Sequence, residues 1–377
     1  MRKKKVALVV STPFIYNAFY KKHIELLRLK YDIYLISNFN EDDCVISGLP
    51  IYHINIERKP SLLKDLETLF KLMKIFKKEK FDIVHTTTPK AGLLAQIAAY
   101  ISKIDIRLHY FTGQVWASKT GYKRELLKFI DKVIGFLPTH ILVDSFSQLD
   151  FLIAENIVKK GKIDVLGQGS ISGVNLNKFH PQNKKNLKIS YSIPEENFVF
   201  LYLGRLNKDK GILDLLEAFE KVHNQYPNIT LLLVGKDEEN LVPFIEKNKL
   251  FNSSIFYHKF TNTPEKFMAT ADVFCLPSHR EGFGTVIIEA AACGTPSIGS
   301  NIYGISDAII DKKTGLLFEV GDINDLAVKM ISLINDRSFL GYLSNNGKDR
   351  VNTYFDENIV SQLLVSYYEN FETFNKI

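Results

Sequence analysis

The feature that most constrains the fold is a repeated alternation of short, wholly apolar runs with amphipathic segments. Runs such as KVALVV, FDIVH and HILVD hold β-branched residues in unbroken series, which is typical of strands buried on both faces of a parallel sheet. Helix-period segments lie between them, for example at residues 61–80 and 122–137. Strands that alternate with helices predict βαβ units and a doubly wound parallel sheet.

The same pattern starts again after a polar, proline-containing segment at residues 180–197, a candidate linker. FVFLYLG, NITLLLVG, SIFYHK, ADVFCLP and TPSIGS predict the strands of a second sheet. A length of 377 residues suits two domains. We therefore predict an α/β protein of two Rossmann-like domains that face each other across a cleft. The first covers residues 1–180 and the second 181–355, and a final helix at about 356–377 returns to the first.

Composition and charge indicate the cellular compartment of the protein and the kind of surface that it meets. Three scattered cysteines argue against disulfides or a zinc site and predict a reducing compartment. The apolar start VALVV is too short for a signal peptide, and no apolar run approaches the ~20 residues of a membrane span, so a cytoplasmic protein is expected. Residues 1–180 hold 28 Lys and Arg against 17 Asp and Glu, a net of +11, while the whole chain carries +6. The first domain is therefore expected to meet an anionic surface.

A strand-end turn in the second half carries two cations. The run FVFLYLG ends at Gly204, and Arg205 and Lys210 follow before a helix begins. In open parallel sheets, ligands bind beyond the carboxyl ends of the strands, where turn amides and helix N-termini favour anions. An arginine and a lysine held there suit a diphosphate, because the guanidinium forks two oxygens and the ammonium adds a point charge. Two solvated loop cations are the alternative that this turn alone leaves open.

A later strand-end turn, SHREGFG, repeats this geometry with carboxylates. Glu281 lies in the turn, and Glu289 lies about one helical turn into the segment TVIIEAAACG. Gly282 and Gly284 let the backbone approach a ligand closely, and carboxylates accept hydrogen bonds from vicinal hydroxyls. The pair indicates a sugar and a ribose beside a phosphate site. A solvated Glu281, with a Glu289 that caps or pairs with a neighbouring loop, is the alternative.

Together the two turns resemble the retaining family 4 glycosyltransferases of the GT-B fold. The resemblance rests on E-G-F-G-x4-E followed by A-x-x-C-G-T-P, with G-R-L-x3-K-G about seventy residues upstream. It extends over nearly the whole chain, including the segment TGLLFEVGDINDLA and the final helix. The two motifs in this order are specific, whereas either one alone would be weak.

The resemblance implies a role for each residue of the two turns. Arg205 and Lys210 would hold the diphosphate of the donor, Glu281 would contact hydroxyls of the transferred sugar, and Glu289 would take the ribose hydroxyls. Relatives work without a metal ion, and the two cations would supply its charge at the leaving group. The donor would be a nucleotide-diphosphate sugar, UDP-linked by analogy, and the reaction would need no cofactor. The remaining donor-binding candidates are Gly204, Gly282, Phe283, Gly284, Thr285 and Val286.

The first domain is expected to bind the acceptor. His109, in IRLHYFTGQVW, is expected to emerge at a strand end toward the cleft, since relatives place a histidine after this strand near the donor sugar. A buried, hydrogen-bonded histidine is the alternative. His85, Lys90 and Gln114 are further candidates at the cleft edge. Trp116, the only tryptophan, offers an aromatic face for stacking on a sugar ring, or anchors the core.

Three segments, TTPKAGLLA, FTGQVW and GSISGVNLNKFHP, look like the subset of these enzymes that builds bacterial capsule, O-antigen and lipid-linked glycans. By that analogy, a hexose or N-acetylhexosamine would move with retention to a polyprenyl-diphosphate-linked acceptor. Basic amphipathic segments in the first domain favour peripheral contact with the anionic inner face of the cell membrane. No motif supports binding of nucleic acid.

Three other functions fit the sequence less well. A nicotinamide oxidoreductase needs G-x-G-x-x-G between a strand and a helix, and the nearest match, GQGSISG at 167–173, runs into NLNKFHP instead. A nucleotide-sugar 2-epimerase or phosphorylase would share the GT-B fold but use other acid and base residues. A non-catalytic subunit of a glycan-assembly complex would have no reason to keep both charged turns.

Overall fold

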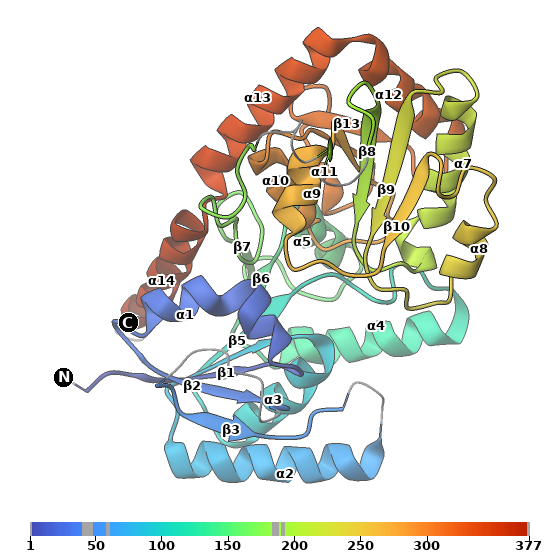
Figure 1. Ribbon diagram of the computed structural model, residues 1–377. Coiled ribbons are helices and arrows are strands. Elements are labelled where there is room, and N and C mark those ends of the chain that lie inside the picture. Colours follow the sequence, from blue (N-terminus) through green and yellow to red (C-terminus); the bar gives the residue numbers. More distant parts are fainter. Residues whose placement is uncertain (1, 40–47, 58–60, 183–187, 190–192, 375–377) are drawn as a thin grey trace. The chain divides into compact units, whose positions relative to one another are not determined.

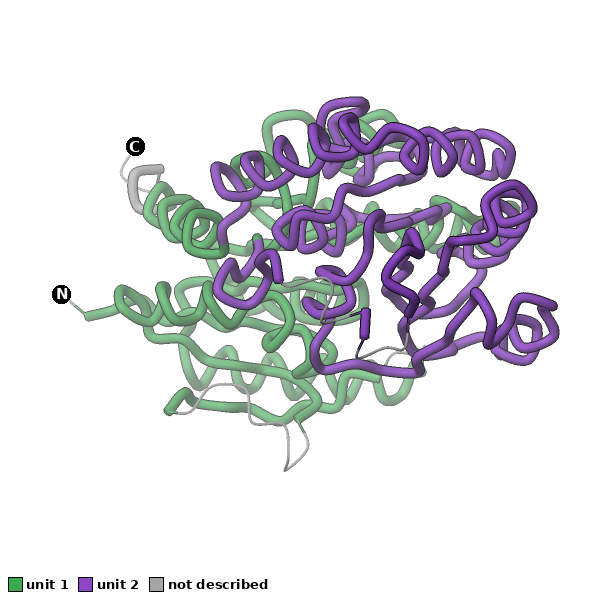
Figure 2. Tube along the Cα trace, turned by 45° about the horizontal axis from the view of Figure 1, so that its top comes forward, with its two compact units in different colours: residues 1–173, 357–377 green, residues 174–356 purple. Residues whose placement is uncertain are grey.

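The computed structural model describes residues 2–39, 48–57, 61–182, 188–189 and 193–374, and the chain divides into two compact units (Figure 1, Figure 2). Unit 1 comprises Met1–Gly173 and Glu357–Ile377, and unit 2 comprises Val174–Asp356. The first unit thus ends at residue 173, where the sequence predicted 180, because the Val174 amide already donates to the Phe355 carbonyl of unit 2 at 2.6 Å. The candidate linker at 180–197 lies partly outside the described residues.

A parallel sheet forms the centre of unit 1. In the described residues its order is β3-β2-β1-β4-β5-β6-β7, and every neighbouring pair is parallel. The central strands are buried on both faces, which is why their sequences are continuously apolar. The strands are β1 (Lys5–Val9), β2 (Asp32–Ser37), β3 (Ile51–His53), β4 (Ile83–Thr87), β5 (Ile106–Phe111), β6 (His140–Val143) and β7 (Ile163–Val165).

Helices cover both faces of this sheet. Unit 1 has η1 (Tyr16–Tyr20), α1 (Lys21–Leu27), α2 (Leu62–Glu79), α3 (Pro89–Ile101), α4 (Gly121–Phe136), α5 (Phe146–Ala154) and α14 (Glu357–Phe374). α1 and α14 pack together over one core cluster. α2, α3, α4 and α5 cover the opposite face, with α3 packed between α2 and α4. α14 therefore completes a unit that begins more than 300 residues earlier in the chain.

Unit 2 repeats the architecture with a second parallel sheet. In the described residues its order is β10-β9-β8-β11-β12-β13, so β8 and β11, whose strand ends carry the two charged turns, are neighbours. The strands are β8 (Phe198–Leu203), β9 (Ile229–Val234), β10 (Ile255–His258), β11 (Val273–Leu276), β12 (Ser297–Ser300) and β13 (Gly315–Phe318). These two sheets confirm the predicted fold class.

The helices of unit 2 begin where local chemistry favours them. α12 begins after Asp322, whose carboxylate accepts from the amides of Asn324 and Asp325, and Asp336 caps α13 in the same way. α7 and α10 instead begin after glycines in the left-handed conformation. The helices are η2 (Lys208–Lys210), α7 (Ile212–His223), α8 (Val242–Glu246), α9 (Pro264–Thr270), α10 (Thr285–Ala292), α11 (Ile305–Ala308), α12 (Ile323–Asn335) and α13 (Arg337–Tyr354).

Candidate functional site

The turn after β8 presents Arg205 on a fixed backbone. The hydroxyl of the buried Tyr202 donates to the Arg205 carbonyl at 2.8 Å. The ends of β8 and β9 also approach so closely that a Cβ on Gly235 would lie 1.8 Å from the Gly204 carbonyl oxygen. The backbone of this turn is therefore held from two sides. The guanidinium group of Arg205, by contrast, lies at the surface, with the side chain 55% exposed.

Lys210 and Glu281 are brought together from two adjacent strand ends. They lie 71 residues apart in sequence, and the Lys210 ammonium forms an ion pair with the Glu281 carboxylate. Their side chains are 14% and 16% exposed. The turn is fixed by Gly211, whose φ is +67° and where a Cβ would lie 2.0 Å from the Pro277 carbonyl oxygen. Only glycine fits at that point, so the turn after β8 rests directly on the end of β11.

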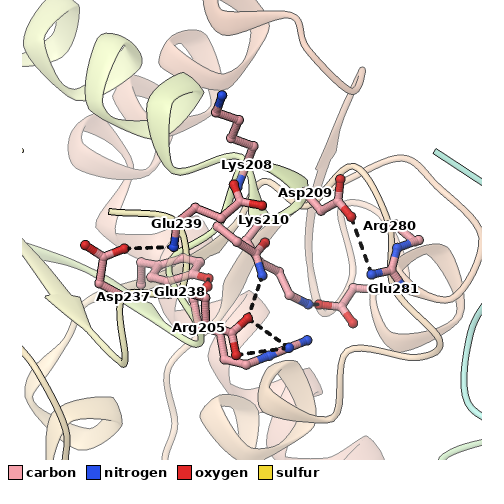
Figure 3. A network of polar contacts seen from close by, with 11 residues as sticks. Arg205, Lys208, Asp209, Lys210, Asp237, Glu238, Glu239, Arg280 and Glu281 are labelled. Atoms are coloured by element: carbon pink, nitrogen blue, oxygen red, sulfur yellow. Dashed lines mark hydrogen bonds and ion pairs between the residues drawn. The ribbon is translucent and has the colours of Figure 1, made fainter. Parts of the chain in front are cut away.

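A third strand end adds a carboxylate that the sequence analysis missed. Glu238, in the loop after β9, accepts from Arg205 at 3.0 Å and from the Asn207 side-chain amide at 3.3 Å. Figure 3 shows Arg205 and Glu238 side by side, with Lys210 and Glu281 next to them. The acidic series Asp237 to Glu239, directly after a buried strand, was the signal available in the sequence. In this structure both cations of the site are therefore neutralised by carboxylates.

Three further contacts tie the turn after β8, and the helix α7 that follows it, to the turn after β11. The His279 amide donates to the Asp209 carbonyl at 2.8 Å, and the His279 ring lies 2.9 Å from the Asp214 carboxylate. Arg280 lies 3.5 Å from the Asp209 carboxylate (Figure 3). The two charged turns consequently behave as one structural element. The sequence prediction did not include His279 and Arg280, although they stand directly before Glu281.

Glu289 lies in α10, on the helix that follows the glycine turn. Gly284 precedes this helix with φ +75°, and Thr285 and Val286 form its half-buried first turn. Glu289 is also half-buried, and burial raises the pKa of its carboxyl group to about 7. Within the described residues its side-chain carboxyl group has no hydrogen-bond or ion-pair partner. A carboxyl group in such a setting is available to accept hydrogen bonds from a ligand.

Phe283 contributes to this turn in a different way from its neighbours. Its side chain is buried and packs against Phe355, with ring centroids 5.5 Å apart. The backbone of the turn is also close to its surroundings, since a Cβ on Gly304 would lie 2.5 Å from the Gly282 carbonyl oxygen. The aromatic residue thus anchors the turn in the core of unit 2, and only its backbone remains for a ligand.

A cavity of about 480 Å³ opens beyond the Arg205 turn. The Leu206 amide donates to the Lys236 carbonyl at 2.8 Å, which joins the turn to the cavity wall. Lys236 follows β9, and the other lining residues end or follow β10. This lining combines aromatic faces with two cations and consists of Lys236, Tyr257, His258, Lys259 and Phe260.

The expected position of His109 is wrong. β5 continues two residues beyond it to Phe111, and its ring is buried, with Nδ1 2.8 Å from the Thr86 hydroxyl. A Cβ on Gly92 would lie 2.5 Å from Cε1 of the ring. Burial lowers the pKa of His109 to about 3, so the ring is neutral at pH 7 and does not emerge from the strand end. The buried alternative describes it correctly.

His85 is likewise a core residue and not a cleft-edge residue. Its Nδ1 lies 2.7 Å from the Tyr368 hydroxyl of α14, and its Nε2 lies 3.2 Å from the Tyr20 hydroxyl. Burial lowers the pKa of His85 well below its ordinary value. Its two ring nitrogens therefore join η1, β4 and α14. This role depends on a helix from the other end of the chain, which local sequence does not reveal.

Trp116 offers no free face for a sugar. It is buried, stacks on Phe151 with ring centroids 5.3 Å apart, and donates from Nε1 to Asp131 at 2.7 Å. The core-anchor alternative is therefore correct. Gln114 is also buried and accepts from the Gln148 side-chain amide at 3.2 Å. Lys90 alone of these candidates stays partly accessible, in an ion pair of 2.7 Å with Asp65.

No group of three or more His, Cys, Asp or Glu side chains suited to a metal ion occurs in the described parts of the chain. The arrangement of unit 2 instead offers two cations, two carboxyl groups and a cavity along neighbouring strand ends. Exchange of Glu238 and Glu281 for the oxygens of an anionic ligand would free both cations to bind it. The site can thus hold a phosphate ester next to hydroxyl-bearing groups.

Family models match both parts of the chain. The model described as glycosyl transferases group 1 matches residues 183–350, and the model described as glycosyl transferase 4-like matches residues 5–129. The capsular polysaccharide biosynthesis glycosyltransferase CapM of Staphylococcus aureus is 35% identical over 353 residues, which are 92% of each chain. A UDP-Gal:alpha-D-GlcNAc-diphosphoundecaprenol alpha-1,3-galactosyltransferase of Escherichia coli is 30% identical over 316 residues, 81% of this chain and 79% of that one.

Solved structures share the fold at lower identity. Sucrose-phosphate synthase from Thermosynechococcus elongatus superposes with a TM-score of 0.81 at 22% identity, over 98% of this chain and all of that one. The Anabaena protein HepE in complex with UDP and glucose gives 0.81 at 16% identity, over 97% of this chain and all of that one. At these identities the likeness establishes the two-sheet architecture alone.

Proposed function

The chain belongs to the group 1 glycosyltransferases, with the GT-B fold, and from this premise we propose which transfer it catalyses. A hexose or N-acetylhexosamine moves from a nucleoside diphosphate, UDP in the first instance, to a lipid-linked sugar in bacterial surface glycan assembly. The anomeric configuration of the sugar is retained. Two relatives support the acceptor class, since they are named for transfer to diphosphoundecaprenol-linked sugars.

One observation carries the donor part of this proposal. Lys210 and Glu281 meet across the ends of β8 and β11, with Arg205 in the same network of contacts (Figure 3). Nothing in the packing of a parallel sheet requires two cations at this edge, whereas a departing diphosphate does. The cavity at the ends of β9 and β10 gives room for the nucleobase. Glu289 then accepts from the ribose hydroxyls.

The proposed chemistry follows from these positions. The bond between the anomeric carbon and the diphosphate oxygen breaks, and its electron pair leaves with the diphosphate, which Arg205 and Lys210 stabilise. The acceptor hydroxyl attacks the same face of the sugar and forms the new glycosidic bond. Its proton passes to an oxygen of the leaving phosphate. Glu281, released from Lys210, binds hydroxyls of the transferred sugar, and no step needs a bound metal ion.

Unit 1 is the proposed acceptor domain, and the acceptor fixes where the enzyme works. A polyprenyl-diphosphate-linked sugar stays in a membrane, so the enzyme must act at a membrane surface. No helix within the described ranges is both long enough and apolar enough to span a bilayer. We place the enzyme at the inner face of the cell membrane, attached peripherally through the basic unit 1.

A screen of nucleotide-sugars by thermal unfolding tests the donor assignment. A donor at about 100 times its Kd stabilises the folded state by about 2.7 kcal/mol, which should raise the melting temperature of a domain the size of unit 2 by roughly 5–10 °C. The screen is run in EDTA, with NADH as the negative control. If no nucleotide-sugar raises the melting temperature, the proposal fails.

The donor found in the screen then allows the reaction itself to be followed by NMR with a short-chain diphosphate-linked acceptor. Transfer with retention is expected, seen as an α-linked product from an α-linked donor. A 2-epimerase would convert the donor without acceptor, and a non-catalytic subunit would bind it without turnover. Either result would replace the proposed reaction.

Exchange of Glu289 for glutamine is expected to weaken nucleotide binding about tenfold at pH 8 and to abolish its pH dependence. Burial raises the pKa of Glu289 to about 7, so the carboxyl group is mostly protonated at pH 6 and ionised at pH 8. Ribose hydroxyls donate to the ionised form, so wild-type affinity should rise about tenfold between these pH values. Calorimetric titration with UDP at pH 6, 7 and 8 measures both effects.

The raised pKa also supplies the control for this variant. Burial disfavours the ionised carboxylate of Glu289, so the folded state without nucleotide is more stable while this group is protonated. That contribution to the free energy of unfolding is lost as the pH rises through about 7. Glutamine is neutral throughout, so Glu289→Gln should melt no lower than wild type at pH 8 without nucleotide. Undiminished UDP affinity in the folded variant would remove Glu289 from the ribose site.

A further inference from the structure

α4 carries a stripe of apolar side chains on its solvent side. Tyr122, Leu126, Phe129, Val133 and Phe136 follow one another at intervals of four and three residues, so they share one face of the helix. Tyr122, Phe129 and Phe136 are 80%, 63% and 73% exposed, Leu126 is exposed, and Val133 is half-buried. We call these five residues the α4 stripe. A helix of a soluble protein ordinarily turns such a stripe toward the core.

The inner side of α4 combines the apolar side chains of Leu127, Ile130 and Ile134 with polar contacts. Asp131 is buried and accepts from Trp116, while Arg124 and Lys128 both bond the Glu155 carboxylate. The guanidinium of Arg124 and the ammonium of Lys128 also lie over the Trp116 ring, 5.2 and 5.8 Å from its centroid. The helix is thus fixed to unit 1 partly by charged contacts. Those contacts hold the α4 stripe outward.

α2 repeats this feature on the same face of the sheet, on the other side of α3. Leu62, Leu63, Leu66 and Phe70 are exposed in its first half, although Leu72 and Phe76 of the same helix lie in the core. Asp65 pairs with Lys90 at the start of α3, so these leucines lie at the carboxyl edge of the sheet. α2 and α4 flank α3 on the side of the sheet away from α1 (Figure 1).

Cations border both apolar stripes. Lys123 and Lys132 on α4, and Lys74 and Lys77 on α2, are exposed and have no ion-pair partner in the described ranges of the chain. They belong to the half of the sequence with a net charge of +11. Exposed aromatic and leucine side chains next to unpaired lysines are typical of helices that lie in the interface of an anionic bilayer.

We propose that the α4 stripe, with the exposed leucines and Phe70 of α2, is the surface by which the enzyme inserts into an anionic phospholipid bilayer. This inference rests on the proposed lipid-linked acceptor. It adds insertion of apolar side chains to the electrostatic membrane contact proposed above. The apolar side chains enter the acyl boundary, and the flanking lysines bind the headgroups. Binding therefore has a salt-sensitive part and a part that high salt does not remove.

The charges favour a bilayer over a second copy of the chain on this surface. Two copies that met through α2 and α4 would bring the unpaired lysines of both copies together, which costs free energy. A bilayer rich in phosphatidylglycerol neutralises the same lysines. Both helices also run from the carboxyl edge of the sheet, where the acceptor sugar is expected. An acceptor anchored in the same bilayer would therefore meet unit 1 from that side.

Flotation of the full-length protein with vesicles of 30% phosphatidylglycerol in phosphatidylcholine tests the surface. The wild type should float with these vesicles and stay partly bound in 0.5 M salt. The double variant Phe129→Asp and Phe136→Asp should bind these vesicles at least about tenfold more weakly than the wild type. Phe244→Asp in α8 of unit 2 is the matched control, because Phe244 is similarly exposed at 59%, and it should bind like the wild type.

A second readout needs no variant. Trp116, the only tryptophan in the chain, lies directly beneath α4, about one helix diameter (roughly 10 Å) from the outer side of that helix. Docking through the α4 stripe should therefore let brominated lipids quench its fluorescence partially. Flotation of the wild type without quenching would mean that another surface docks, and would overturn the inference.

Activity separates this inference from the proposed function. Transfer to a short-chain, water-soluble acceptor should be unchanged in the double variant, while transfer to a vesicle-embedded acceptor should fall. If the wild type transfers to the soluble acceptor but does not float, the surface is wrong and the proposed function stands. If the double variant instead changes the oligomeric state in sedimentation, the stripe joins copies of the chain. Absence of transfer to either acceptor would contradict the proposed function.

Discussion

Replacement of Lys210 by alanine is expected to lower the turnover number by about two to three orders of magnitude, the size of effect seen when one charge-stabilising donor is removed from an active site. The ammonium group is largely buried against the end of β11, so bulk water cannot replace its charge at the departing diphosphate. Donor affinity should change less than turnover, because Arg205 still binds the ground state. Steady-state kinetics with the identified donor separates the two effects.

Lys208→Ala is the matched control for this variant. Lys208 lies in the same short helix, η2, but its side chain points away from Lys210 and Glu281 (Figure 3). It should retain nearly full turnover, and Lys210→Arg should recover part of the loss because the charge is kept. A Lys210→Ala enzyme that turns over like the Lys208→Ala enzyme would show that the leaving group is stabilised elsewhere.

Gly211→Ala is expected to lower both stability and activity. A Cβ at this position would lie 2.0 Å from the Pro277 carbonyl oxygen, and the backbone has φ +67°. Left-handed strain costs about 1–2 kcal/mol, and overpacking about 1–3 kcal/mol more. The melting temperature should fall by roughly 5–15 °C. Because the turn must also move away from β11, Lys210 loses its alignment with Glu281 and turnover should drop at least about tenfold.

Gly341→Ala is the control that shows whether the loss of stability and turnover in Gly211→Ala is specific to the turn after β8 or follows from any glycine substitution. Gly341 is an exposed residue in the interior of α13, where an added Cβ meets nothing within 4 Å. Alanine there should stabilise the helix by about 1 kcal/mol and leave kinetics unchanged. Differential scanning calorimetry with parallel kinetics compares the two variants. Equal melting temperatures for Gly211→Ala and wild type would mean that the end of β11 does not hold the turn.

The positions of Arg205, Lys210 and Glu281 were open to prediction because they depend on strand ends alone. Parallel strands present their carboxyl ends at one edge, so residues just after two buried runs meet whatever their separation in sequence. Glu238 obeys the same rule after β9 and was missed because an acidic run also suits a solvated loop. β3 and β13 were missed as well, since they are short edge strands without a long apolar run.

The errors in unit 1 have a different origin. The burial of His85 depends on Tyr368, which lies 283 residues away, and that of Trp116 depends on the inner face of α4. Local pattern assigns a residue to a strand or a loop, but it does not show which helix will cover that residue. His109 lies inside its strand, and local sequence does not distinguish a buried polar residue near the end of an apolar run from a residue at the strand end.

Unit 1 is assembled from segments that the ribosome produces at different times. All of unit 2 is synthesised between Gly173 and Glu357, so nascent unit 1 exposes the apolar surface that α14 later covers, including Ile24 and Leu27 of α1. During that interval, His85 has no phenol from Tyr368 to bind. Completion of unit 1 is therefore a late folding event, and a nascent chain stalled before residue 357 should be a substrate for chaperones.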